Sequence, residues 1–147
     1  MNPWIRLWRR EHDRLASYAR SLTASDADAE DLLSDVMTRL VERRARARDP
    51  LAYALRSIRH ERARLARRRA VAPPMPRDAS DATPDLEDAL GRLSEIEREV
   101  VMLKARSGIT LRRIATVLEL PEGTVRSHYT RGLRRLRASL LEEVIDV

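Results

Sequence analysis

A proline-rich segment divides this chain of 147 residues into two parts. The stretch VAPPMPRDASDATPD, residues 71–85, combines four prolines with serine and aspartate, a composition that is typical of extended linkers. Each part must therefore fold on roughly 70 residues and can bury only a small core. We expect one domain at residues 1–70 and a second at residues 85–147, with a linker at 71–84.

Both parts are predicted to be helical. Phenylalanine is absent, there are only four glycines, and alanine, leucine and arginine dominate, which favours helices over sheets. Apolar residues recur at steps of three and four, most regularly over residues 29–41. Ser25, Ser94 and Thr110 stand where helix N-caps are expected. The predicted fold class is all-α, with two small helical domains and a helix-turn-helix in the second.

The charge of the chain indicates a polyanionic partner. The formal net charge is +6 and the isoelectric point is about 10.8, which fits nucleic acid or, less well, an anionic membrane surface. The chain has no cysteine, which excludes disulfides and cysteine-based metal sites and is typical of a reducing cytoplasm. No apolar run approaches the ~20 residues of a membrane span, and no signal peptide is apparent at the start.

No catalytic or cofactor-binding motif is present. The three histidines, His12, His60 and His128, are far apart, and Arg64 stands where a zinc-binding HExxH motif needs its second histidine. The glycines form neither a dinucleotide-binding nor a phosphate-binding loop. We therefore expect no enzymatic activity, no cofactor and no metal site.

The stretch LPEGTVRSHYTRGLRRLR, residues 120–137, follows a short predicted helix and a tight turn, as the second helix of a helix-turn-helix does. At 100° per residue its apolar side chains form one stripe and its basic and hydroxyl side chains lie opposite. The first turns of such a helix reach base edges in the major groove. The residues expected there are Thr124, Arg126, Ser127, Thr130 and Arg131. A solvated amphipathic helix would give the same pattern.

Two features of this helix remain open from the sequence. Arg134, Arg135 and Arg137 fit either phosphate contacts or plain solvated surface. Gly132 is expected to weaken the helix by ~1 kcal/mol relative to alanine.

Together these motifs resemble those of bacterial RNA polymerase sigma factors. LSEIEREVVMLKARSGITLRRIATVLELPEGTVRSHYTRGLRRLR resembles sigma region four, and DADAEDLLSDVMTRL and DPLAYALRSIRHERARLARRR resemble region two of the extracytoplasmic-function class. The order of region two, proline-rich linker and region four is similar to that class over nearly the whole chain. The resemblance implies a sigma region-two-like domain at 1–70 and a region-four-like domain at 85–147.

The resemblance implies three contact surfaces. Region two would dock on the clamp helices of core RNA polymerase through the second helix, with Asp31, Ser34, Asp35 and Arg39. The third helix would read and open the minus-ten promoter element with Tyr53, Arg56, Arg59, His60 and Arg64. Region four would bind the minus-thirty-five element through the five recognition residues named above. Because so few aromatic side chains are available to hold unstacked bases, we expect weak unaided strand opening.

The predicted function is that of an alternative sigma factor, which gives core polymerase its promoter specificity in the cytoplasm. Its expected partners are core RNA polymerase and double-stranded promoter DNA, with an anti-sigma factor as a further candidate. Two alternatives stay open from the sequence. One is a LuxR-like helix-turn-helix regulator that does not bind core polymerase, because that domain shares "LS..EREV" and "EGTV". The other is a sigma mimic that titrates an anti-sigma factor.

Overall fold

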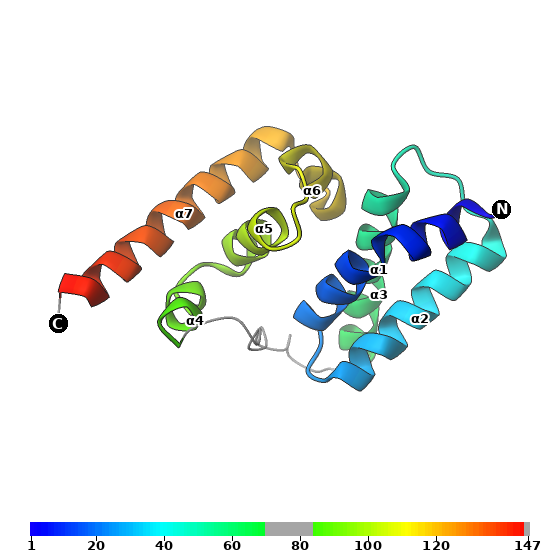
Figure 1. Ribbon diagram of the computed structural model, residues 1–147, viewed down its shortest axis with the longest axis horizontal. Coiled ribbons are helices and arrows are strands. Elements are labelled where there is room, and N and C mark those ends of the chain that lie inside the picture. The colour runs from blue at the N-terminus through cyan, green and yellow to red at the C-terminus, as the bar shows by residue number, and fades with distance from the viewer. Residues whose placement is uncertain (70–83, 146–147) are drawn as a thin grey trace. The chain divides into compact units, whose positions relative to one another are not determined.

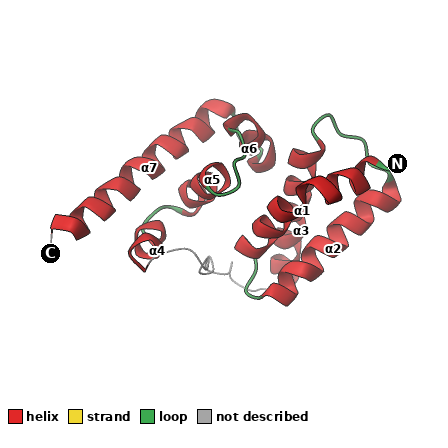
Figure 2. Cartoon of the chain, in the orientation of Figure 1, coloured by secondary structure: helices red, strands yellow, loops and turns green. Residues whose placement is uncertain are grey.

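The structure is a computed structural model that describes residues 1–69 and 84–145 (Figure 1). The chain divides into two compact units, Met1–Arg77 and Asp78–Val147. Every regular element in the described residues is an α-helix (Figure 2), so the predicted all-α class is confirmed. The predicted linker at 71–84 lies outside the described residues except for its last position, Pro84, where a helix begins. The predicted domain boundaries remain predictions.

The first unit is a bundle of three helices, α1 (Pro3–Ser21), α2 (Asp26–Arg43) and α3 (Pro50–Arg69), each packed against the other two. Helix α1 is kinked at Glu11, whose φ and ψ of −118° and 16° are not helical. The core combines apolar side chains from all three helices: Trp4, Leu7, Leu15, Leu33, Val36, Leu55 and Ile58.

Side chains cap the starts of these helices. The Ser25 hydroxyl accepts the Asp28 N–H at 3.1 Å, which confirms the cap predicted for α2. Asn2 accepts the Trp4 N–H at 2.8 Å at the start of α1. At the other end of α2, Arg44 takes a left-handed conformation with φ 49°, which ends the helix and starts the segment that leads to α3.

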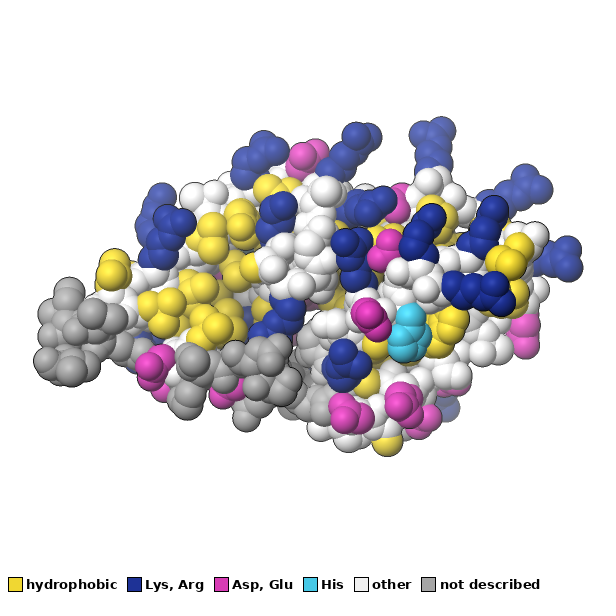
Figure 3. All heavy atoms as spheres, in the orientation of Figure 1, with side chains coloured by type: hydrophobic (Ala, Val, Ile, Leu, Met, Phe, Trp, Pro, Cys, Tyr) yellow, Lys and Arg dark blue, Asp and Glu magenta, His cyan; other side chains and the backbone are white. Residues whose placement is uncertain are grey.

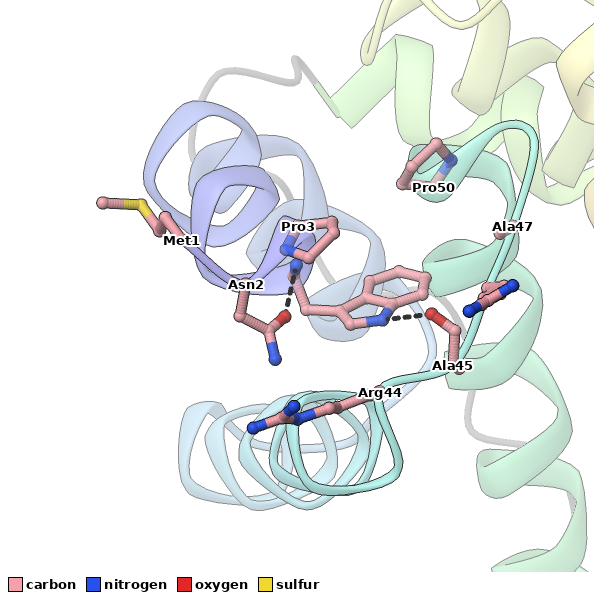
Figure 4. A pocket seen from close by; sticks show the side chains of 9 residues that line it. Met1, Asn2, Pro3, Arg44, Ala45, Ala47 and Pro50 are labelled. Carbon is pink, nitrogen blue, oxygen red and sulfur yellow. Dashed lines mark hydrogen bonds between the residues drawn. The ribbon is translucent and has the colours of Figure 1, made fainter.

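Trp4 anchors that segment to α1. Its indole Nε1–H donates to the carbonyl oxygen of Ala45 at 2.8 Å (Figure 4), and its ring lies 5.6 Å from that of Tyr53. The side chain of Asn2 donates to the carbonyl of Val41 at 3.2 Å. The first residues of the chain thereby fix the end of α2 and the path into α3.

The second unit contains α4 (Pro84–Gly91), α5 (Glu95–Ala105), α6 (Leu111–Leu118) and α7 (Glu122–Ile145). Helix α7 packs against each of the other three. Ser94 and Glu97 form a capping box at the start of α5, as the sequence predicts for Ser94. Gly108 has a φ of 64°, and this left-handed residue turns the chain toward the buried Ile109 before α6.

Gly132 of α7 lies close against α5. A Cβ atom at this position would stand 2.8 Å from Cγ2 of Val101 and 3.5 Å from Cβ of Glu97. The sequence alone predicts a cost from helix propensity, but the absence of a side chain here also permits the close contact of the two helices. Packing therefore explains why a glycine at position 132 suits this fold.

Replacing Gly132 by alanine is expected to destabilise the second unit or leave it unchanged. Overpacking costs about 1–3 kcal/mol, which offsets the ~1 kcal/mol gain in helix propensity. Gly123→Ala is the matched control in the same helix, because nothing lies within 4 Å of a Cβ there. Urea unfolding of the whole chain followed by circular dichroism compares the two variants. If Gly132→Ala stabilises the chain as much as Gly123→Ala, the packing explanation is wrong.

Candidate nucleic-acid and polymerase interfaces

Helices α6 and α7 form the helix-turn-helix. Thr110 caps α6 by accepting the Arg113 N–H at 3.2 Å, as predicted. Glu119, with a φ of 56°, ends α6 in the left-handed conformation, and α7 begins three residues later at Glu122. Ile114 of α6 and Val125 of α7 are both fully buried. Packing between α6 and α7 fixes the angle at which the start of α7 is presented to solvent.

The five predicted recognition residues lie on the first turns of α7. Arg126, Ser127, Thr130 and Arg131 are exposed, and Thr124 is half-buried. Their contacts run along the helix itself. Arg126 reaches Glu122 at 3.3 Å, the Ser127 hydroxyl donates to the carbonyl of Gly123 at 3.0 Å, and Arg131 contacts the ring of His128 at 3.3 Å. Exposed pairs of this kind are worth at most about 1 kcal/mol, so a base or phosphate can replace them.

The role of Arg135, which the sequence left open, is partly structural. Its guanidinium donates to Glu97 of α5 at 2.9 Å, and the Glu97 side chain is only 4% exposed. Burial raises the pKa of this carboxyl, but the Ser94 N–H, the Arg135 charge and the Ser94 hydroxyl together hold the pKa below its ordinary value. Arg135 therefore joins α7 to α5. Arg134 and Arg137 are exposed.

In the first unit, α2 presents a polar strip on the side away from the core. Asp31, Ser34 and Asp35 are exposed there, whereas Leu32, Leu33 and Val36 are buried. These three belong to the predicted polymerase surface. The fourth predicted member, Arg39, instead extends toward α3, where both of its terminal nitrogens bond Glu61, at 3.0 and 3.1 Å.

Glu61, which the sequence did not single out, pairs with two of the predicted site residues. Its carboxylate accepts bonds from Arg39 of α2 and from Arg64, three residues further along α3. The hydrogen bonds from Arg64 and then those from Arg39 lower the pKa of Glu61 to about 2, against the effect of burial. The carboxylate is thus ionised at neutral pH and ties the two helices together.

Four of the five residues predicted to contact the downstream element share one side of α3. At 100° per residue, Tyr53, Arg56, His60 and Arg64 fall within a quarter of the helix circumference, whereas Arg59 points aside. The Arg56 guanidinium lies 5.1 Å from the centre of the Tyr53 ring, within the range of a cation–π contact. Tyr53 in turn packs on Trp4. The helical geometry of α3 therefore places four of the residues on one side and Arg59 at its margin, and the structure shows a direct contact between Tyr53 and Arg56.

A hollow of about 550 Å³ lies between the start of α1 and the segment that connects α2 to α3 (Figure 4). It is lined by Met1, Asn2, Pro3, Trp4, Arg44, Ala45, Arg46, Ala47 and Pro50. Its walls combine apolar groups with two guanidinium groups.

In the space-filling view, many dark-blue Arg and Lys side chains stand out from the surface (Figure 3).

The described residues show neither a membrane-spanning helix nor a metal-binding cluster. No helix among them is long and apolar enough to cross a membrane. Residues 1–69 and 84–145 also bring together no group of three His, Asp or Glu side chains that could hold a metal ion.

Comparison with protein families shows which family the chain belongs to. Residues 7–71 match the family described as Sigma-70 region 2, and residues 84–136 match Sigma-70, region 4. The chain belongs to the sigma-70 family. Only residues 72–83 separate the two matches, so regions two and four follow one another directly, as in sigma factors of the extracytoplasmic-function type. The match to region two favours a sigma factor over a LuxR-like regulator.

Solved structures share the fold of this sigma factor. The sigma factor RpoE, in complex with the anti-sigma factor NepR from Bartonella quintana, is 21% identical with a TM-score of 0.74, covering 95% of this chain and 98% of that one. CnrH, in complex with the cytosolic domain of CnrY, is 24% identical with a TM-score of 0.66, covering 95% and 88%. The PhyRSL–NepR complex from Sphingomonas sp. Fr1 is 19% identical with a TM-score of 0.73, and the match covers 92% of this chain and 87% of that one. A comparison with curated proteins found no match.

Membership of the family gives the function at the level of the whole chain. Sigma factors bind core RNA polymerase and promoter DNA, and this chain is an alternative sigma factor that directs transcription initiation. The sigma-70 family is not a family of enzymes.

Proposed function

We propose that three helices divide the work of this sigma factor. Helix α2 docks on the clamp helices of core polymerase through Asp31, Ser34 and Asp35, α3 reads the minus-ten element, and the start of α7 reads the minus-thirty-five element. One observation carries the proposal. On both α2 and α7, exposed polar side chains lie opposite a buried apolar face, so each helix can bind a partner without losing its core contacts.

The residues on α3 have matched chemistry for DNA. The guanidinium of Arg56 lies over the aromatic ring of Tyr53, and His60 and Arg64 continue the same side of the helix. The hollow next to Trp4 is a candidate place for an unstacked base, because base capture needs apolar walls and cationic groups for the phosphate. With so few aromatic side chains, opening is expected to require a promoter close to the consensus sequence.

We place this activity in the cytoplasm, where core polymerase and the chromosome meet. The chain itself is proposed to have no catalytic activity, because the polymerase supplies the chemistry. An anti-sigma factor is a candidate partner, since RpoE is known in complex with NepR and CnrH in complex with CnrY. Copurification with candidate anti-sigma factors would test this partner separately from DNA binding.

The double variant Asp31→Lys, Asp35→Lys tests the polymerase surface. Reversing two exposed charges replaces attraction by repulsion, and we expect the affinity for core polymerase to fall roughly tenfold or more. Glu30→Lys is the matched control, because Glu30 is exposed on the same helix but points about 100° away from Asp31. Fluorescence anisotropy with labelled chain measures the affinity. If the double variant binds core polymerase as tightly as the control, the assignment of this face is wrong.

A further inference from the structure

Two arginines from different helices share one carboxylate in the first unit. Arg39 of α2 donates to the two oxygens of Glu61 at 3.0 and 3.1 Å. Arg64 of α3 donates to the same two oxygens, with its Nε at 3.0 Å. Each oxygen thus accepts one bond from each guanidinium, and Glu61 holds both planar groups at one carboxylate.

The three side chains differ in exposure. The Glu61 side chain is 8% exposed, whereas those of Arg39 and Arg64 are 41% and 42% exposed. A guanidinium has five N–H donors, and Glu61 takes two from each arginine. In this group of three side chains the carboxylate is buried and the two guanidinium groups reach the surface. Its net charge is +1.

The group adjoins the side of α3 for which we propose DNA contact. Arg64 shares that side with Tyr53, Arg56 and His60, and Arg39 joins it from α2 through its bonds to Glu61. Arginine pairs bidentately with phosphate, and a donor held in place before binding loses less conformational entropy than a mobile one. A phosphate approaching this side of α3 would meet two guanidinium groups that are already in place.

We propose that Glu61 is a positioning residue that holds Arg39 and Arg64 together as one binding site for a backbone phosphate of the downstream promoter element. The inference rests on the proposed role of α3. It moves Arg39 from the polymerase surface, where the sequence predicted it, to the DNA surface. Glu61 itself touches no DNA, because its carboxylate is covered by the two arginines.

The test uses the sigma factor bound to core polymerase and a promoter duplex, and it measures DNA affinity across a salt series. Arg39→Ala is expected to weaken promoter binding several-fold and to reduce the slope of log K against log salt by about 1, with core affinity unchanged. Arg62→Ala is the matched control, because Arg62 points to the opposite side of α3 and donates to the carbonyl of Leu22 at 3.2 Å. The control should leave the slope unchanged.

Glu61→Gln gives the sharper result, because a pure charge effect and a positioning effect change the affinity for the promoter in opposite directions. The variant adds one unit of positive charge, which alone would strengthen DNA binding. Loss of the shared anchor is expected instead to weaken promoter binding several-fold. Arg39→Lys, which keeps the charge but cannot bond both oxygens in the same way, should lie between Arg39→Ala and the unaltered chain. Thermal unfolding of each variant separates these effects from loss of fold.

Three outcomes would overturn the proposal. Stronger promoter binding by Glu61→Gln would mean that the carboxylate only neutralises the arginines. Weaker core binding by Arg39→Ala, with unchanged DNA binding, would return Arg39 to the polymerase surface. An unchanged salt slope for Arg39→Ala would exclude a phosphate contact. Arg56→Ala distinguishes failure of this proposal from failure of the proposed function. If Arg56→Ala also leaves promoter binding unchanged, the proposed role of α3 itself is wrong.

Discussion

Replacing Trp4 by alanine is expected to destabilise the first unit by about 3–5 kcal/mol, the range for losing a large aromatic side chain from a core. The Trp4 side chain is fully buried, packs on Tyr53 and donates to the carbonyl of Ala45. A small domain has a total stability of only about 5–15 kcal/mol, so the loss leaves this unit marginal. The segment between α2 and α3 would lose its anchor as well.

Two further variants separate the contributions of Trp4. Trp4→Phe keeps an aromatic ring but leaves the Ala45 carbonyl without its indole donor, at a cost of about 1–2 kcal/mol. Trp8→Ala is the matched control, because Trp8 is only half-buried and contacts His12 edge-on, and it should cost less than about 2 kcal/mol. Thermal and urea unfolding by circular dichroism give these values. Equal losses for Trp4→Ala and Trp8→Ala would contradict the role of Trp4 as an anchor.

Arg126→Ala is expected to cost about 1–3 kcal/mol of binding to the upstream element and to relax specificity at a single base pair. Arg126 is exposed on the second turn of α7 and forms a surface pair with Glu122. That pair can be exchanged for a bidentate contact to guanine. Binding of the holoenzyme to a set of single-base-pair promoter variants measures the effect.

Arg137→Ala is the matched control for Arg126. It removes the same charge from an exposed position about three turns further along the helix, beyond the turns that reach base edges. Its effect should be small and uniform across promoter sequences. A uniform loss for Arg126→Ala as well would make that residue a phosphate contact and would remove it from the base-reading set.

The helices and their caps could be predicted because the signals are local. The apolar spacing of α2 and the caps Ser25, Ser94 and Thr110 depend on residues within one or two turns. The pairs that join helices could not be predicted in this way. Arg39 meets Glu61 across 22 positions, and Arg135 meets Glu97 across 38. A single sequence does not say which of many charged side chains will meet after folding.

The same limit applies to the candidate sites. Exposure of Asp31, Ser34, Asp35 and the start of α7 follows from helical periodicity, so the sequence could predict that these side chains face solvent. Gly132 shows the converse, because its helix propensity is readable from the sequence but its contact with Val101 is a tertiary property. The assignment of each surface to a partner came from the family resemblance and not from the physical pattern.

Reconstitution with core polymerase, followed by mapping of transcript starts on genomic DNA, tests the account most directly. Core polymerase with this chain should initiate at a limited set of sites that share an upstream and a downstream element. Arg126→Ala should change the preferred upstream sequence, and the Asp31→Lys, Asp35→Lys variant should abolish the specific starts. If the chain leaves the start sites of core polymerase unchanged, its proposed division of labour between α2, α3 and α7 is wrong.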